Sequence, residues 1–287
     1  MQQVRTLPPW RASLAVGVLL ATSSLAAPLA AAADGYVPQE GEGTNPITDR
    51  FYLRATFWRA SVRTQLRIDP TGNPYGGTSL SGENDLGLPE RDNQGRVELM
   101  FRLRERNRFR VDYLLEDRSG QVTLPRTVVF GDQTFPPGTT VQSTLNWRMM
   151  GFTYTHAFLQ TEHFELGAGL GVHLIDADAI AQTPDLLQRH ETSVAGAWPT
   201  LAVDGIWNIS RRFALTARGQ YLGTDVNKFS GSLADYHGDV QYRWKRNFAV
   251  GLGYSYIRAS YESQSNGTPG RLVLALSGPE MFVRISF

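Results

Sequence analysis

Alternation of large apolar and polar or charged residues constrains this chain more than any other feature. At residues 97–103, Val, Leu, Phe and Leu occupy every second position, and Glu98 and Arg102 lie between them. Successive side chains of a β-strand point to opposite faces, so this segment has one apolar face and one face too charged for a soluble core. A strand between lipid and a lumen shows this pattern over about nine to eleven residues. The pattern predicts a transmembrane β-barrel.

The same pattern recurs along the chain and predicts an all-β, up-and-down antiparallel barrel of about ten strands. The segments lie near residues 51–57, 97–103, 109–115, 150–155, 164–172, 200–207, 213–221, 235–244, 248–256 and 281–287. Eight or twelve strands stay open, because weak strands merge easily and bacterial barrels have even numbers. Near Met149 and Met150 the phase of the alternation changes, which we interpret as a β-bulge.

The connections alternate between short and long. The short ones are expected at residues 105–107, 160–163, 208–212 and 245–247. The long ones, rich in Gly, Asp, Asn and Pro, are expected at residues 69–95, 117–138, 176–191, 225–231 and 263–270. Outer-membrane barrels have short periplasmic turns and longer outer loops. We therefore expect both termini of the barrel in the periplasm.

The first 33 residues have the three-part layout of a secretory signal peptide. Arg5 and Arg11 precede or flank an apolar run at residues 12–26, which is too short to span a bilayer, and small residues follow. We expect cleavage after Ala33. Residues 34–49 are then a flexible periplasmic lead-in, in which residues 34–46 have nothing to pack against, and residues 50–287 form the barrel. A retained membrane anchor is the alternative.

Composition removes several functions. The chain has no cysteine, so disulfides, thiolate metal sites and a lipid-modified cysteine are excluded. The formal net charge of +1 gives no indication of nucleic acid binding. His156, His163 and His173 show no metal-ligand spacing. We expect no metal and no cofactor.

The chain ends with apolar residues at alternate positions, Met281, Val283 and Ile285, followed by the aromatic Phe287. This ending resembles the C-terminal signature of bacterial outer-membrane barrels. Residues 231–256 are similar to the last hairpin of small proteobacterial barrel proteins, many of them uncharacterised. The resemblance implies a Gram-negative outer membrane, lipid and lipopolysaccharide around the barrel, and periplasmic chaperones and the barrel-assembly machinery as partners. It implies no catalytic residue, and the oligomeric state stays open.

Charged residues on the lumen-facing positions are the main candidate site. They are Arg54, Glu98, Arg102, Arg104, Arg110, Asp112, Glu116, Glu165, Asp204, Arg218, Asp235, Asp239, Arg243 and Arg284. Because opposite charges occur in similar numbers, we interpret them as a self-neutralising network that fills a narrow barrel. The alternative is a narrow channel in which these charges set ion selectivity.

An enzyme is the second class of function. Omptin proteases are ten-stranded barrels with an Asp-Asp couple and an Asp-His couple at the outer rim. Asp176 with Asp178 and Asp235 with His237 are similar in local spacing, although the order along the chain and the flanking residues differ. A lipid-modifying enzyme and an adhesin or receptor acting through the outer loops also stay open. Six aromatic residues are expected at the membrane interfaces: Trp58, Tyr113, Tyr154, Trp207, Tyr242 and Trp244.

Overall fold

The structure is a computed structural model that describes residues 45–73, 75–185, 188–226, 229–263 and 270–287. The expected signal peptide and residues 34–44 of the expected lead-in lie outside the described residues. Within the described part, no helix is long and apolar enough to cross a membrane.

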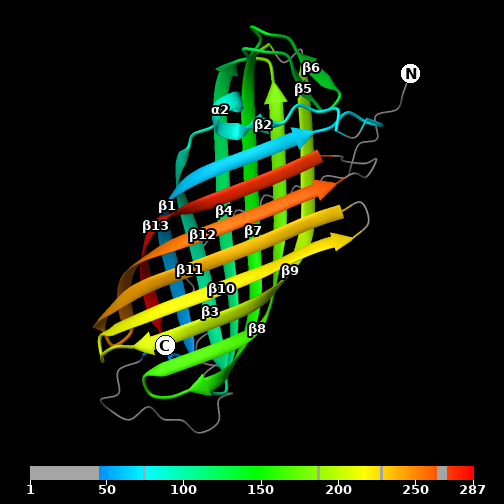
Figure 1. The fold of residues 1–287 in the computed structure, drawn as a ribbon. Coiled ribbons are helices and arrows are strands. Elements are labelled where there is room, and N and C mark those ends of the chain that lie inside the picture. Colours follow the sequence, from blue (N-terminus) through cyan, green and yellow to red (C-terminus); the bar gives the residue numbers. More distant parts are fainter. Residues whose placement is uncertain (1–44, 74, 186–187, 227–228, 264–269) are drawn as a thin grey trace, which may run out of the picture. The chain divides into compact units, whose positions relative to one another are not determined.

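Ten long antiparallel strands form a closed barrel, which confirms the predicted fold class (Figure 1). The strands are β1 (Phe51–Ile68), β3 (Arg91–Leu103), β4 (Asn107–Thr123), β7 (Thr140–Gln160), β8 (Phe164–Gln182), β9 (Arg189–Asn208), β10 (Phe213–Val226), β11 (Phe229–Lys245), β12 (Phe248–Ser263) and β13 (Gly270–Ser286). Each strand pairs with the next one along the chain, and β13 pairs with β1. This closure leaves no free edge at the level where all ten strands meet.

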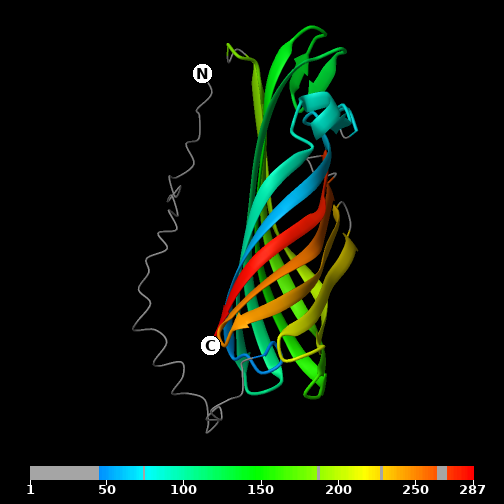
Figure 2. The same ribbon diagram turned by 90° about the vertical axis from the view of Figure 1, so that its left-hand side faces the viewer.

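Tight turns join the strands at one end of the barrel, and four short elements cover the other end (Figure 2). These elements are β2 (Leu80–Ser81), α2 (Gly82–Leu86), β5 (Val128–Phe130) and β6 (Gln133–Phe135). We call residues 80–88 and 124–135 the lid. Its leucines and phenylalanines pack on inward-facing Leu66, Val141 and Leu145 of the strands. The ends are therefore different: one is a rim of turns and the other has its own apolar cluster.

The outward face of each strand changes character part-way along. On β1, the apolar Phe51, Leu53 and Phe57 point outward at the turn end, and polar residues follow outward from Arg59 to Gln65. On β8, outward Leu170 and Leu174 give way to Asp176. These changes lie at the same level of the wall, because one row of register partners runs from Phe57 through Gly95, Leu115 and Arg148 to Asp176. We call the part with apolar outward residues the belt half and the rest the outer half.

The inward face changes in the opposite sense. On β1, Arg54 and Thr56 point inward in the belt half, whereas Trp58, Ala60 and Val62 are buried inside the outer half. The belt half is therefore apolar outside and polar inside, as a barrel in lipid requires. The outer half is polar outside and apolar inside, like a soluble protein.

The β-bulge expected at Met149 and Met150 is absent. β4 and β7 pair without interruption from Asn107–His156 to Thr123–Thr140, and the register shift on β7 falls between Ala157 and Leu159 in its pairing with β8. Phe152 and Tyr154 do point outward as expected. The change of phase in the sequence is the change from apolar inward residues, which end at the buried Met149, to small or polar inward residues after it.

Two other expectations are wrong for the same reason, which is the reversal of polarity between the two halves. Much of the expected loops 117–138 and 176–191 is strand, because their alternation continues with reversed polarity. Trp58 does not lie at a membrane interface: it is inside the barrel and 1% exposed. The lead-in also packs at its end, since Ile47 and Asp49 are buried.

The wall is incomplete beside β9. This strand pairs with β8 from Arg189 to Trp207, but with β10 only from Leu201 to Asn208 among the described residues. Pro199 lies just before this pairing begins and has no N–H to donate to a neighbouring strand. In the outer half, β9 and β10 therefore run apart, and the upper part of β9 stays paired with β8 (Figure 1).

Candidate functional site: the barrel interior

Paired charges occupy the interior of the belt half. The arginines are Arg54, Arg96, Arg102, Arg108, Arg110, Arg218, Arg243 and Arg284. The carboxylates are Asp49, Glu98, Asp112, Glu165, Asp204, Asp235, Asp239 and Glu280. The two sets are equal in number, and none of these side chains is more than 12% exposed. The set is neutral as a whole, which meets the condition for burying charges.

Arg54 of β1 is the centre of one cluster. Its guanidinium is 2.8 Å from Asp239 Oδ2 and 2.7 Å from Glu280 Oε1. The same guanidinium lies 3.5 Å from the ring centroid of Phe282. Its partners come from β11 and β13, so this one side chain joins three strands across the lumen.

Arg96 of β3 holds a second cluster. Its Nη2 is 2.8 Å from Asp112 Oδ2 and 2.6 Å from Asp235 Oδ2. Asp112 is on the adjacent strand β4, whereas Asp235 is on β11. This arginine therefore bridges the interior, as Arg54 does, rather than pairing only along the wall.

Glu98 is contacted by two arginines and one tyrosine. Arg218 Nη1 lies 2.5 Å from Glu98 Oε2, Arg110 Nε lies 3.4 Å from Oε1, and the Tyr52 hydroxyl donates to Oε1. The side chain of Glu98 is 2% exposed. Its charge is thus compensated entirely by side chains of this network.

Inward-facing glycines make room for these long side chains. At Gly167, a Cβ atom would lie 2.9 Å from Arg108 Nη2, and at Gly253 it would lie 2.8 Å from Asp239 Cβ. Glycine inside a strand commonly marks such a close approach. Glycine at these positions of β8 and β12 therefore leaves room for atoms of nearby strands and for the charged side chains beside them.

The structure places the sequence-predicted lumen residues in this network, with two exceptions. Arg104 lies exposed in the turn between β3 and β4, with φ of 57°. Glu116 points inward but lies just beyond the belt half, outside the network. Its Oε1 atom is 2.8 Å from Arg118 Nε. Arg218 and Arg243 belong to the network and are its most exposed members.

Four members of the network were not predicted. Arg96 fell at the edge of an expected loop, Arg108 beside an expected turn, and Asp49 in the lead-in. Glu280 follows Gly278 and Pro279. Because Gly and Pro are uncommon inside strands, the sequence did not indicate a strand at this point. Between Trp58–Glu280 and Ser61–Ser277 the β1–β13 pairing is interrupted, and the Trp58 indole N–H donates to the Gly278 carbonyl at 3.1 Å. If the alternating segments that begin at residues 97 and 109 had been extended by one or two residues, Arg96 and Arg108 would have been predicted to face the lumen.

The four weak catalytic candidates are not brought together. Asp176 and Asp178 lie on the outward face of β8, and Asp176 is 3.8 Å from Arg148. Asp235 and His237 lie on the inward face of β11 and are buried. The barrel wall separates the two couples, so they cannot activate one water molecule.

Ser255, His237 and Asp239 form a hydrogen-bonded chain that invites comparison with a hydrolase. The Ser255 hydroxyl is 2.8 Å from His237 Nδ1, and His237 Nε2 is 2.7 Å from Asp239 Oδ2. A nucleophile needs its oxygen open to a substrate. Ser255 is 1% exposed and donates to Glu280 at 2.5 Å. The chain is part of the buried network.

Two groups have ligand atoms close enough for a metal ion: Asp112, His173 and Asp235, and His237, Asp239 and Glu280. In each group these atoms lie within 4.8 Å of one another. Arg96 pairs with both carboxylates of the first group, and Arg54 with both of the second. A cation at either place would meet a guanidinium that already neutralises its carboxylate ligands. The donor sets fit internal ion pairs better than a metal.

An apolar layer lies above the charges. Trp58, Trp147 and Trp198 are buried in one cluster, with Leu114, Met149, Ile175, Leu233, Ile257, Leu274 and Leu276. These residues come from strands all round the barrel. An ion passing along the axis would meet both the charged network and this layer.

Comparison with known proteins bears on the fold. The structure is similar to that of the outer membrane protease OmpT from Escherichia coli, with a TM-score of 0.55 and 11% identity, over 83% of this chain and 97% of that chain. The chain has the fold of an outer-membrane β-barrel. At this identity the likeness concerns the fold alone.

Two further solved barrels are less similar. The transport unit of the autotransporter AIDA-I from Escherichia coli has a TM-score of 0.39 at 11% identity, covering 85% of this chain and 92% of that chain. The attachment invasion locus protein Ail of Yersinia pestis has a TM-score of 0.33 at 9% identity, covering 81% and 99%. No protein-family model and no curated protein matches the chain.

Proposed function

We propose that this chain is an integral outer-membrane barrel whose lumen does not conduct ions, a structural wall rather than a pore. The observation that carries this proposal is the closed set of eight arginines and eight carboxylates inside the belt half. A selectivity filter keeps charges available to a passing ion. Here each charge is already paired with another side chain.

The test is the current through single molecules. The mature chain, refolded in detergent and checked by its heat-modifiable migration on SDS gels, is inserted into a planar bilayer. Folded protein is expected to give no discrete current steps at neutral pH. Reproducible steps from protein that migrates as folded would contradict the closed lumen.

Arg102→Gln separates the closed barrel from a narrow channel. Arg102 Nη1 is 2.8 Å from Glu165 and 2.6 Å from the Glu105 carbonyl, so the substitution leaves buried acceptors unpaired. In a closed barrel the variant loses stability and stays silent. In a channel its main effect is a changed cation-to-anion selectivity.

The same proposal includes the location and the orientation. The apolar belt supports contact with outer-membrane lipid and lipopolysaccharide. One end of the barrel has the tight turns together with Phe51 and Phe287, and the other end has the lid. With the turn end in the periplasm, both termini of the barrel lie in the periplasm. Cleavage of a signal peptide after Ala33 would deliver the chain there. Protease digestion of intact cells, which should cut the lid and spare the turns, tests this orientation.

Phe287 is the proposed assembly signal, together with Met281, Val283 and Ile285. Phe287 exchanges backbone hydrogen bonds with Phe51 at 2.8 and 3.1 Å, and the two rings are 6.0 Å apart. The residue thus pairs at the seam that closes the barrel. Deleting Phe287 is expected to reduce the heat-modifiable form in cells strongly, because the assembly machinery and the seam both lose their contact. Unchanged amounts would contradict this role.

A further inference from the structure

Four arginines point outward just beyond the belt, all on one side of the barrel. They are Arg59 and Arg63 on β1, Arg91 on β3 and Arg258 on β12, and all four side chains are exposed. The strands β3, β1, β13 and β12 are consecutive in the wall. Arg59 is the first outward residue after Phe57, with which the apolar outward positions of β1 end. We call these four residues the arginine patch.

Register pairing places the arginine patch around two serines. Ser61 of β1 lies opposite Arg91 on one side and Ser277 of β13 on the other. Arg59 and Arg63 are two residues before and after Ser61, so they share its outward face. The floor between these long side chains is therefore made of short ones that carry hydroxyls.

Arg258 closes the patch on the far side of β13. It lies opposite Ala275, which in turn lies opposite Arg63. Neighbouring strands are about 4.8 Å apart, so the backbones of Arg258 and Arg63 are about 10 Å apart with an alanine between them. Guanidinium groups bind phosphate oxygens through paired N–H donors, and this spacing leaves room for phosphate between them.

The charge of the arginine patch is not compensated within the part of the chain that the structure describes. There, no member of the patch forms an ion pair, and neither does the neighbouring Glu90. The arginines of the interior network, by contrast, are all paired. Four like charges close together repel one another, so an anion from outside the chain would stabilise them.

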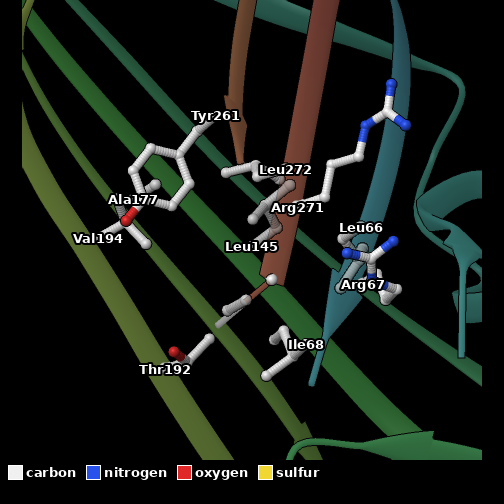
Figure 3. Close-up of a pocket in the computed structure, with 12 residues that line it drawn as sticks. Leu66, Arg67, Ile68, Leu145, Ala177, Thr192, Val194, Tyr261, Arg271 and Leu272 are labelled. Carbon is white, nitrogen blue, oxygen red and sulfur yellow. The ribbon is translucent and has the colours of Figure 1, made fainter. Parts of the chain in front are cut away.

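Higher on the same strands, Arg67 and Arg271 also point out of the barrel, away from Ala177 and Val194 in its interior (Figure 3). These two arginines share Glu262: Arg67 Nη2 is 3.6 Å from Oε1, and Arg271 Nε is 3.9 Å from Oε2. Their charge is therefore partly compensated within the chain. The arginine patch below them is what remains for an external anion.

The opposite side of the barrel has acidic residues beyond the belt. The strand β8 is half-way round the wall from β13 and has Asp176 and Asp178 on its outward face. Asp117 is outward and exposed on β4. The outward Arg148 of β7 lies 3.8 Å from Asp176. An anionic headgroup is therefore attracted to one side of the barrel and repelled from the other.

The level and the charge of the arginine patch define its partner. The belt contacts hydrocarbon up to Phe57, so the patch lies where the headgroups of the outer leaflet begin. A phospholipid diester supplies a single negative charge to four guanidinium groups. A phosphate monoester carries a charge of about −1.5 to −2, so a glycolipid with two of them compensates the whole patch.

We propose that the arginine patch binds the phosphate groups of a bis-phosphorylated glycolipid of the outer leaflet, chemically the lipid A part of lipopolysaccharide. One phosphate lies over Ser61 and Ser277. The acyl chains run along Phe57 and Met281, which lie opposite each other in the belt. This inference rests on the proposed outer-membrane location and is independent of whether the lumen conducts.

The test is native mass spectrometry of the folded barrel released from nanodiscs. The bilayer contains equal small fractions of bis-phosphorylated lipid A, monophosphoryl lipid A and phosphatidylglycerol. A single bis-phosphorylated lipid A is expected to stay bound to each barrel, with an affinity about tenfold higher than that of either other lipid. Equal retention of the three lipids would overturn the proposal, because a general attraction of anionic lipid would then be sufficient.

A double variant and a matched control locate the site. Arg63→Gln with Arg258→Gln removes half of the arginine patch from exposed positions and is expected to lower the affinity for lipid A about tenfold. Arg148→Gln removes an outward arginine from the opposite side and should leave the affinity unchanged. Heat-modifiable migration checks that each variant is folded. Equal affinities of the two variants would overturn the site.

A second pair of variants tests the floor of the patch. Ser277→Asp places a carboxylate among the arginines, which compensates their charge within the chain and should abolish the preference for bis-phosphorylated lipid A. Ser193→Asp makes the same change on the outward face of β9 and should preserve the preference. A preference that survives in Ser277→Asp would overturn the proposal even if the double variant did not fold.

Two further outcomes separate the site from its source and from the proposed location. Excess inorganic phosphate should not displace the lipid; complete displacement would make free phosphate the ligand and contradict the lipid source. Folded protein that inserts into bilayers but shows no lipid preference would refute the arginine site alone. Protein that inserts into no bilayer would refute the proposed location, and the site with it.

Discussion

The belt half and the outer half of this barrel have opposite faces. In residues 51–57 of β1, the outward positions are apolar and the inward ones include Arg54; in residues 59–67, the outward positions are polar and the inward ones include Val62 and Leu66. The strand, its pairing and its period of two residues are the same in both halves. The difference teaches that the surrounding solvent, and not the fold, decides which face is apolar.

The two halves are also held together differently. Ion pairs fill the belt half, and each depends on a specific partner. The outer half has a packed apolar interior, in which stability depends on filled volume. Substitutions at the two levels should therefore have effects of different kinds, and four experiments measure this difference.

The largest effect is expected from Glu98→Gln. The amide leaves Arg218 without its anion and Arg110 with Asp204 alone, 3.5 Å away, and breaking a buried ion pair costs about 3–5 kcal/mol. Urea unfolding of the folded barrel in lipid vesicles measures the loss. Asp176→Asn is the matched control: its pair with Arg148 is 3.8 Å apart with side chains about half exposed, so less than about 1 kcal/mol is expected. Equal effects would mean that the network is not what stabilises the belt half.

Leu170→Arg should have the next largest effect. Leu170 is 62% exposed on the outward face of β8 within the belt, where a charge facing hydrocarbon costs about 2–4 kcal/mol. Ser193→Arg makes the same change outward on β9, beyond the belt, and should be nearly neutral. The same unfolding measurement applies. If the arginine at 193 cost as much, the limit of the belt would be placed wrongly.

Ile257→Val tests the apolar interior of the outer half. Ile257 is 0% exposed, and losing its methylene should cost about 0.5–1.5 kcal/mol through lost burial and a small cavity. Ile285→Val removes the same group from the outward face of β13, where lipid can fill the space. A smaller loss is expected there. A larger loss for Ile285 would indicate that the belt, rather than the outer half, is the tightly packed side.

The smallest effect concerns the connection between the lid and the segment that follows β1. The Thr71 N–H and hydroxyl donate to Asp132 at 2.7 and 3.0 Å, and these hydrogen bonds lower the pKa of Asp132. A lowered pKa means that the contribution is present at neutral pH and is lost as the pH falls below about 4 through the folded pKa. The protection factor of the Thr71 amide, which is its exchange rate relative to that of an unstructured amide at the same pH, should fall on acidification. Asp132→Asn should remove this pH dependence; if it persists, another group is responsible.

The belt half could be predicted from the sequence because its outward residues meet lipid and must be apolar at every second position. Phe101, Leu115 and Tyr254 carry that pattern directly. The outer half could not, since Asn146, Asp176 and Ser193 point to water and look like loop residues. There, alternation is weak because the inward residues include small ones such as Ala177 and Gly196.

The candidate site was predictable only as a set of residues. Arg54 and Asp239 were each expected to face the lumen, but nothing in the sequence pairs them, because they are 185 residues apart. Asp49 and Glu280 could not be predicted to face the lumen, because the residues around them do not have the composition of a strand. Which guanidinium meets which carboxylate depends on the shear and closure of the whole barrel.

The sequence separation within the ion pairs has a consequence for how the barrel forms. Arg284 meets Asp49 across 235 residues, Arg54 meets Glu280 across 226, and Arg96 meets Asp235 across 139. None of these pairs exists until the first and last strands are side by side. A partly closed sheet exposes unpaired charges and is poorly suited to enter lipid, so charge pairing makes insertion and closure a single cooperative event.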